Sequence, residues 1–319
     1  MPIIKRGSET QLLDIEWCWK PYIPYGKVSQ VVGSGGEGKT TMVLTVAALL
    51  SQGITPPTLS RGHLLPSESC EPVSIFYLTN EDEVADSSLK RFIRAGGDDG
   101  KFFYSGELQE HMTLERDSLL YVINASKCRL LIIDPIQAFL PEGVNMNNTA
   151  KMRPLMTMLA NVAKETGVAI VLVGHLNKNE SSKLINQVGG TSDLAASVRS
   201  ILLVEMSKKD RDLRWVKAIK SNFDESDYTP IRLVMDEERR LSFEEMEEED
   251  DEEDAAPSKT ARAEEIIEGM LENGSVPVAD IKAACKAEGI SGKTAQRARK
   301  LLGVIQDYEN GVPVWKWDE

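Results

Sequence analysis

The first indication of the fold comes from residues 33–40, which read Gly33-Ser34-Gly35-Gly36-Glu37-Gly38-Lys39-Thr40. This stretch fits the pattern G-x-x-x-x-G-K-[ST] at every specified position. It follows an apolar run at residues 28–32 and precedes an amphipathic stretch, so a strand leads into the loop and a helix leaves it. Glycines let backbone N–H groups converge on phosphate oxygens, and the helix N-terminus adds positive potential. The stretch therefore predicts a binding site for a nucleoside triphosphate.

The residue types around this loop also predict a magnesium site. Lys39 is expected to reach the β- and γ-phosphates, and the Thr40 hydroxyl is expected to ligate Mg²⁺. Thr41 starts the helix and is a further candidate phosphate contact. Asp134 ends the apolar run at residues 130–133, where an acid can hold Mg²⁺ through its water shell. An Asp before a proline can instead cap a turn, but beside a complete phosphate loop the metal role is favoured.

Hydrolysis of the nucleotide requires a further group that orients or deprotonates water. Glu81, just past the apolar run at residues 74–78, is the candidate. Asp82 and Glu83 follow it, so the three acids can also be read as an acidic helix start. His175 follows the run at residues 168–173, where it can contact the γ-phosphate or serve a purely structural role.

Five short apolar runs separated by helical patterns predict a parallel sheet that is buried on both faces. The runs are residues 28–32, 74–78, 130–133, 168–173 and 201–204, and the intervening helices are expected at 40–51, 85–95, 115–125 and 150–166. Polar residues gather at the carboxyl ends of four runs, which is the ligand edge of an open α/β sheet. From Arg214 onward the pattern changes to antiparallel strands with a hairpin.

The net charge of -13 seems to exclude a nucleic-acid partner, because phosphate binding needs a positive face. However, residues 244–254 (EEMEEEDDEED) alone hold 10 acids and no base, and the two flanking regions are nearly neutral, at -2 and -1. Such a run is expected to stay solvated. The sequence therefore predicts an ATPase domain at 1–243, an acidic disordered linker at 244–257 and a second domain at 258–319.

The second domain is predicted to be a small winged helix-turn-helix. Helical patterns cover residues 261–272, 279–288 and 292–302, Ser291 is a suitable N-cap for the third, and a hairpin follows. The third helix can present base-reading residues to DNA; its candidate contacts are Lys293, Arg297, Arg299 and Lys300, with Thr294 and Gln296 able to reach base edges. A winged helix can equally serve only for protein docking or dimerisation.

Several classes of protein are not indicated by the sequence. The apolar runs are too short to span a bilayer, so no membrane partner is expected. The first ten residues lack the pattern of a signal peptide, and the four cysteines have no disulfide or zinc spacing. We therefore expect a cytoplasmic protein.

Taken together, these motifs resemble the RecA-like P-loop ATPases, in particular the hexameric replicative helicases of the RepA type. The resemblance extends over most of residues 15–243. It rests on WKPYIPYGK (19–27), the glycine loop, YLTNED (77–82), LLIIDPIQAF (130–139), VGH (173–175), VGGTSDLAASVRS (188–200) and KAIKSNF (217–223).

The resemblance implies roles for individual residues. Glu81 matches the catalytic glutamate of these ATPases, and His175 matches the residue that senses γ-phosphate. Lys220 lies where related rings carry a basic finger that reaches the neighbouring subunit's nucleotide. Asn222 stands where some relatives have an arginine, so Lys217 and Arg199 are alternative fingers. The segment at 177–191 corresponds to loops that face a central DNA channel, where the candidate contacts are Lys178, Lys183, Asn186 and Gln187.

Three functions remain open at this point. The first is a Mg-ATP-dependent DNA motor that works as a hexameric ring around single-stranded DNA. The second is a DNA-bound ATPase without unwinding activity that acts in regulation, recombination or loading. The third is a switch in which ATP controls DNA binding by the winged helix.

Overall fold

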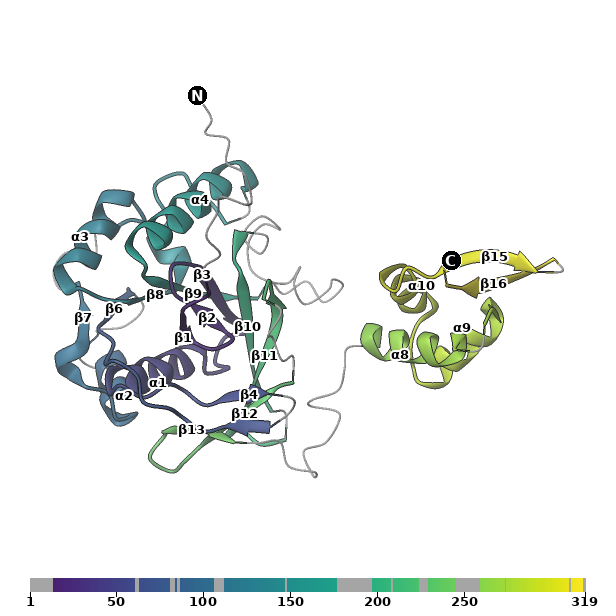
Figure 1. The fold of residues 1–319 in the computed structure, drawn as a ribbon, viewed down its shortest axis with the longest axis horizontal. Coiled ribbons are helices and arrows are strands. Elements are labelled where there is room, and N and C mark those ends of the chain that lie inside the picture. The colour runs from purple at the N-terminus through teal and green to yellow at the C-terminus, as the bar shows by residue number, and fades with distance from the viewer. Residues whose placement is uncertain are drawn as a thin grey trace. The chain divides into compact units, whose positions relative to one another are not determined.

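The computed structural model describes residues 14–60, 63–80, 84, 87–105, 112–146, 148–176, 197–207, 209–223, 229–244, 259–272, 274–309 and 311–317. The chain divides into two compact units, residues 1–247 and 248–319. The boundary falls inside the acidic run. Each unit is described by itself below (Figure 1).

A nine-stranded sheet forms the centre of the first unit, in the order β13-β12-β11-β10-β3-β9-β8-β6-β7. The six strands from β10 to β7 are parallel to one another, and β10 to β13 are joined antiparallel. The strands are β3 (Val28–Gly33), β6 (Ile75–Thr79), β7 (Phe102–Tyr104), β8 (Leu130–Asp134), β9 (Ala169–His175), β10 (Ser200–Met206), β11 (Leu213–Ser221), β12 (Ile231–Met235) and β13 (Leu241–Glu244).

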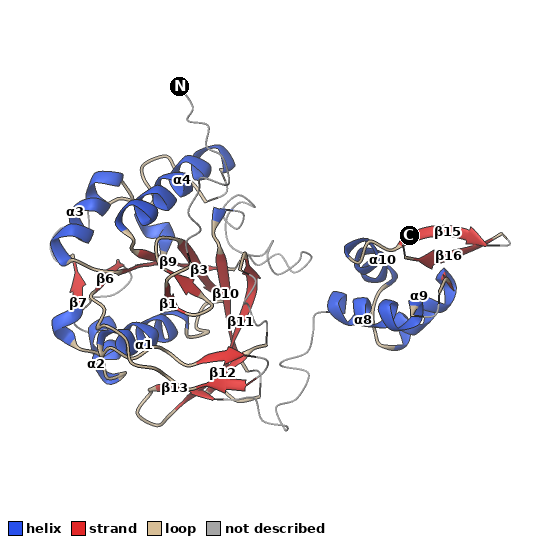
Figure 2. Cartoon of the chain, viewed as in Figure 1, coloured by secondary structure: helices blue, strands red, loops and turns tan. Residues whose placement is uncertain are grey.

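Helices cover both faces of this sheet, which explains why its central strands are apolar along their whole length. Helices α1 (Lys39–Ser51) and α2 (Ser88–Arg94) pack on one face, and α3 (Arg116–Ser126) and α4 (Thr149–Thr166) pack on the other (Figure 2). Strand β3 serves both cores, because Val31 faces the first pair of helices and Val32 the second. Two short 3-10 helices, η2 (Asp99–Lys101) and η4 (Ile136–Phe139), complete the connections.

The fold class predicted from the sequence is confirmed. All five predicted parallel strands and the antiparallel extension are present, and β9 lies between the phosphate-loop strand β3 and the aspartate strand β8. The sequence reading missed strand β7 and two small hairpins, β1 (Trp17–Trp19) with β2 (Ile23–Pro24) and β4 (Thr58–Ser60) with β5 (His63–Leu65). These are strands of two or three residues, too short to show a hydrophobic period.

The second unit contains helices α8 (Lys259–Leu271), α9 (Val278–Ala287) and α10 (Gly292–Leu301) and strands β14 (Val276–Pro277), β15 (Ile305–Glu309) and β16 (Val312–Lys316). The strands form an antiparallel sheet in the order β14-β16-β15. Trp315 is fully buried in the small core between helices and sheet. Ser291 caps α10, as expected, by accepting a hydrogen bond of 3.2 Å from the Thr294 N–H.

Among the described residues, no helix combines the length and the apolar character needed to cross a membrane.

Candidate functional site

The carboxyl ends of four parallel strands meet at one edge of the sheet. Gly33 at the end of β3 pairs with His175 at the end of β9, and Thr79 at the end of β6 pairs with Asp134 at the end of β8. The loop predicted to bind phosphate leaves from this edge and leads into α1. The polar residues that the sequence placed after separate apolar runs are therefore brought together, as expected for an open α/β sheet.

Two glycines of the loop adopt backbone conformations that side chains rarely tolerate. Gly36 has φ of 83°, and Gly38, which is the N-cap of α1, has φ of 93°. Lys39 then turns back over the loop, where its Nζ donates hydrogen bonds to the carbonyls of Gly33 (3.0 Å) and Ser34 (2.7 Å). The lysine ammonium and the N-terminus of α1 thus lie at one concave surface, which suits the phosphates of a nucleotide.

A hydrogen-bonded chain of three side chains lies beside the loop. The Thr40 hydroxyl donates to Asp134 Oδ2 over 2.7 Å, and the hydroxyl of the buried Tyr77 donates to the same oxygen over 3.0 Å. Burial and the charge of Asp134 both raise the pKa of Tyr77, so its hydroxyl stays protonated as a donor. A hydroxyl beside an anchored carboxylate is a donor set that magnesium accepts, so Thr40 and Asp134 fit the predicted metal.

The outer side of the loop is held by the end of β10 and the start of β11. The backbone N–H of Met206 donates to Glu37 Oε2. Arg214, only 6% exposed, packs so closely on Gly38 that a Cβ built on this glycine would lie 2.8 Å from its Nε. Burial lowers the pKa of Arg214, whereas the nearby carboxylates of Asp212 and Glu37 raise it. Among the described residues, its Nε and Nη1 are buried without a hydrogen-bond partner, so this guanidinium adds positive charge next to the loop.

A cavity of about 300 Å³ opens over the loop. Gly36, Gly38 and residues 39–41 form its floor, and Asp134 and His175 border it. Its remaining lining residues are cationic or apolar: Arg91, Arg94, Met235 and Arg239. The size and charge of the cavity match a nucleotide, which needs several hundred Å³ and a positive surface.

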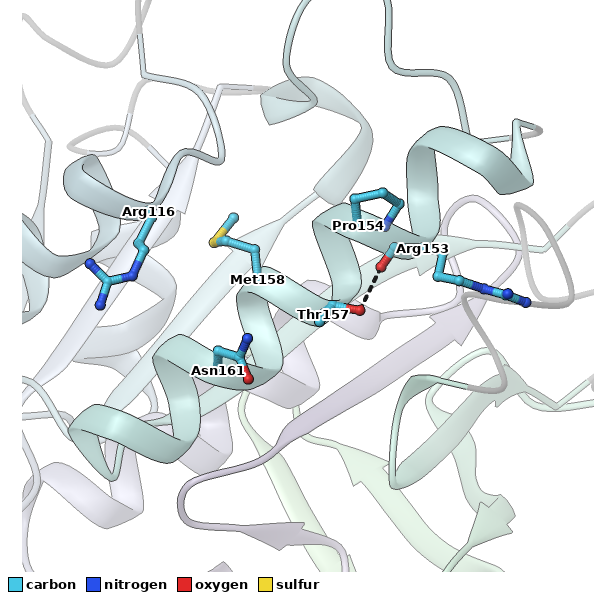
Figure 3. A pocket seen from close by; sticks show the side chains of 6 residues that line it. All are labelled: Arg116, Arg153, Pro154, Thr157, Met158 and Asn161. Atoms are coloured by element: carbon cyan, nitrogen blue, oxygen red, sulfur yellow. Dashed lines mark hydrogen bonds between the residues drawn. The ribbon is translucent and has the colours of Figure 1, made fainter. Parts of the chain in front are cut away.

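A second cavity, of about 450 Å³, lies elsewhere, along the outer surfaces of α3 and α4 (Figure 3). Arg116, Arg153 and Asn161 line it together with Pro154, Thr157 and Met158. Arg116 is already paired with Glu165 at 2.6 Å, and Thr157 donates to the Arg153 carbonyl at 2.9 Å. The cavity is an open surface groove whose described lining includes no carboxylate, histidine or lysine, so we place the functional site at the smaller cavity.

Of the remaining predicted catalytic residues, only one lies at the cavity in the described part of the chain. His175 is exposed and borders the cavity at the end of β9. Lys220 lies on β11 beside the start of β10, so it is near the opposite edge of the sheet from Lys39 of the same chain. Its Nζ donates to the Val198 carbonyl over 2.7 Å, and burial and the nearby Arg199 lower its pKa. Lys217 is paired with Glu205 at 2.9 Å. Glu81 lies outside the described residues.

The predicted DNA contacts are described only in part. Lys178, Lys183, Asn186 and Gln187 lie outside the described residues, as does the side chain of Arg297. Lys293 and Lys300 are exposed on α10. Arg299 instead has a packing role within the second unit: its Nη1 donates to the Val304 carbonyl over 3.2 Å, and its guanidinium lies 5.6 Å from the centre of the Trp315 ring.

Several residues of the site were not predicted from the sequence. Tyr77 lies inside an apolar run, and the sequence assigned it no role of its own. Arg91 and Arg94 are three residues apart on a short helix, where basic residues usually form a solvated face. Arg214 and Arg239 belong to the antiparallel extension. They lie near the loop because the order of strands in the sheet places that extension beside β3. Tyr77 begins the YLTNED motif, but that motif did not reveal its contact with Asp134, and the four arginines belong to no local motif.

Comparison with known proteins gives three findings. A family model described as an AAA domain matches residues 4–181. The DNA repair protein RadA of Pseudomonas aeruginosa is 28% identical over 109 residues, which are 34% of this chain but only 22% of that protein, so the match spans about a fifth of the relative.

Two solved structures are similar at 15% sequence identity. The KaiC-like protein PH0186 of Pyrococcus horikoshii OT3 aligns over 70% of this chain and 91% of its own, with a TM-score of 0.48. The RadB recombinase aligns over 69% of this chain and 91% of its own, with a TM-score of 0.49.

Proposed function

Because this chain belongs to the AAA domain family, we propose that it is a Mg-ATP-dependent ATPase that acts on DNA as a ring-shaped motor of the RepA helicase type. The observation that carries the ATPase part is the contact of Thr40 with Asp134 at 2.7 Å, beside a lysine held over the same loop. These side chains come from parts of the chain 94 residues apart, and they form the combination that nucleotide hydrolysis requires.

Each residue of the site has a part in this proposal. Bound Mg²⁺ would neutralise charge on the β- and γ-phosphates. Lys39 and the backbone N–H groups of the loop orient the phosphates, and Thr40 and Asp134 hold the metal. Glu81 orients the attacking water, and His175 reports the γ-phosphate to the segment at 177–191, which contacts DNA through Lys178, Lys183, Asn186 and Gln187.

The position of Lys220 supports assembly into a ring. Because this residue lies toward the amino ends of the parallel strands, whereas the loop lies at their carboxyl ends, Lys220 cannot complete the site of its own chain. It can supply charge only to a neighbouring subunit. We therefore place each ATP site between two subunits, in a homo-oligomer that we take to be a hexamer.

The second unit is proposed to be a winged helix-turn-helix that binds DNA through α10. The order helix, strand, helix, helix and two strands supports this assignment, as do the exposed Lys293 and Lys300. Arg297 is a further contact in this proposal. The name of the matched relative, a DNA repair protein, supports a role with DNA. We place the protein in the cytoplasm.

A DNA-bound ATPase without unwinding activity is the second candidate, because the RadA match concerns repair. The two are separated by measuring ATP hydrolysis with and without single-stranded DNA, strand displacement on a forked duplex, and molar mass with ATP. The motor predicts DNA-stimulated hydrolysis, displacement and a multimeric mass. Stimulation without displacement would favour the second candidate, and a monomer that is indifferent to DNA would contradict both.

Mixing two inactive variants tests the shared site. Lys39→Ala and Lys220→Ala should each lose about 10²–10³-fold in turnover, since each removes a cation that stabilises the transition state. In an equimolar mixture, about one interface in four pairs an intact Lys39 with an intact Lys220, so activity should return in part. Lys220→Arg is the matched variant and should stay active by itself. A mixture that remains inactive although mixed oligomers form would contradict a site shared between subunits.

A further inference from the structure

The positive charge at the phosphate loop has a third source besides the N-terminus of α1 and Lys39. The side chain of Arg214, on β11, packs on Gly38, where an added Cβ would lie 2.8 Å from its Nε and 3.1 Å from its Cδ. Gly38 lines the nucleotide cavity, whereas Arg214 is not among the described residues that line it. The guanidinium therefore lies behind the loop, and the backbone of the loop separates it from the space for the phosphates.

The sheet places Arg214 there because β10 and β11 extend past the end of β3. The last pair in the register of β3 with β10 joins Val32 to Leu203. Strand β10 continues to Met206, which lies opposite Arg214 of β11. The backbone N–H of Met206 donates to the Glu37 carboxylate. Two residues that face each other across one antiparallel pair of strands thus contact the outer side of the loop.

This position is unfavourable for a cation in the ligand-free loop. Arg214 is 6% exposed, and among the described residues its Nε and Nη1 have no hydrogen-bond partner. A buried donor without a partner costs free energy, and a cation at the N-terminus of a helix opposes the helix dipole. Burial lowers the pKa of Arg214 more than the carboxylates of Asp212 and Glu37 raise it. The fold therefore holds this charge where the ligand-free protein is destabilised by it.

We propose that Arg214 is a positioning residue whose charge raises the affinity of the loop for phosphates and lowers the stability of the ligand-free protein. This inference rests on the proposed ATP site and adds a residue outside the cavity to it. Phosphate oxygens on the other side of Gly38 supply negative charge to both the guanidinium and the helix N-terminus, so binding relieves their repulsion. The charge attracts the phosphates before and during hydrolysis, so it strengthens the binding of substrate and transition state alike.

The test compares full-length Arg214→Met, which loses the charge, and Arg214→Lys, which keeps it, with wild type. In Arg214→Met, calorimetry with Mg²⁺ should show about 10-fold weaker binding of both imido-ATP and inorganic tripolyphosphate, because the attraction is to phosphate charge. The KM for ATP should rise by a similar factor, whereas kcat should stay within about three-fold of wild type. Arg214→Lys should bind both probes within about three-fold of wild type, because it retains the cation.

A second measurement separates charge from packing. Without nucleotide, the urea midpoint of Arg214→Met should lie above that of wild type, because an apolar side chain replaces a buried charge that lacks hydrogen-bond partners. Arg232→Met on the neighbouring strand β12 is the matched control. The Arg232 side chain is only 14% exposed, and its Nη1 is paired with Glu244 Oε2 at 2.7 Å. This variant should have a lower midpoint, because it breaks an ion pair, and should bind both probes as wild type does.

The remaining outcomes contradict the inference. Unchanged phosphate binding in Arg214→Met would overturn it, as would weaker binding combined with a midpoint that does not rise, because Arg214 would then only support the shape of the loop. Equal losses in the methionine and lysine variants would overturn it too. Lys39→Ala tests the proposed function separately. If Lys39→Ala binds both probes as wild type does, the ATP site fails and the inference with it; if Lys39→Ala loses them and Arg214→Met does not, the inference alone fails.

Discussion

Replacing Lys39 with alanine is expected to lower the turnover of ATP hydrolysis by about 10²–10³-fold, the usual cost of removing one group that stabilises transition-state charge. The Lys39 ammonium lies over the loop within 3.0 Å of the carbonyls of Gly33 and Ser34, so it is already positioned for the phosphates. No other lysine lines the described part of the cavity and could replace it. Phosphate release under saturating Mg-ATP measures the effect.

The control for this prediction is Lys164→Ala. Lys164 is an exposed lysine in the last turn of α4, on the face of the sheet opposite to α1. This variant should keep wild-type turnover. Circular dichroism should show that both variants are folded. If Lys39→Ala retained more than about a tenth of wild-type turnover while folded, the loop would not be the catalytic site.

Replacing Gly33 with alanine is expected to destabilise the first unit by about 1–3 kcal/mol, the typical cost of forcing atoms into a packed interior. A Cβ on Gly33 would overlap the backbone carbonyl oxygen of Val204 in the neighbouring strand β10. A backbone group held in a sheet cannot rotate away as a side chain can, so β3 and β10 would have to separate. Because the loop begins at Gly33, nucleotide affinity should fall together with stability.

Gly35→Ala is the matched comparison, because a Cβ at this position meets no atom within 4 Å. Urea unfolding followed by circular dichroism should give a midpoint near wild type for Gly35→Ala and a clearly lower one for Gly33→Ala. Equal midpoints for the two variants would show that β3 and β10 are not packed as described.

The parts of this structure that could be predicted from sequence are those encoded by neighbouring residues. The glycine loop, the apolar strands and the N-cap at Ser291 each depend on a few consecutive positions, and each is present. Asp134 could be placed beside the loop because the carboxyl ends of parallel strands share one edge of the sheet. No detailed knowledge of packing was needed for these predictions.

The remaining features depend on contacts between distant segments. Arg91 and Arg239 line one cavity only because α2 and the turn between β12 and β13 lie on either side of α1. A local pattern can also mislead when packing is not visible. Arg299 belongs to a basic helix, yet its guanidinium lies against Trp315 and bonds the Val304 carbonyl, so charge along the sequence does not by itself identify a DNA contact.

Strand β11 carries a residue of the proposed mechanism near each of its two ends. Its nine residues span about 30 Å, with Arg214 packed on the phosphate loop of its own chain near one end and Lys220 near the other. In a ring with shared sites, every such strand would belong to two nucleotide sites at once. Its backbone, hydrogen-bonded to β10 and β12, then makes each site sensitive to the occupancy of the next, and hydrolysis should depend cooperatively on ATP concentration around the whole ring.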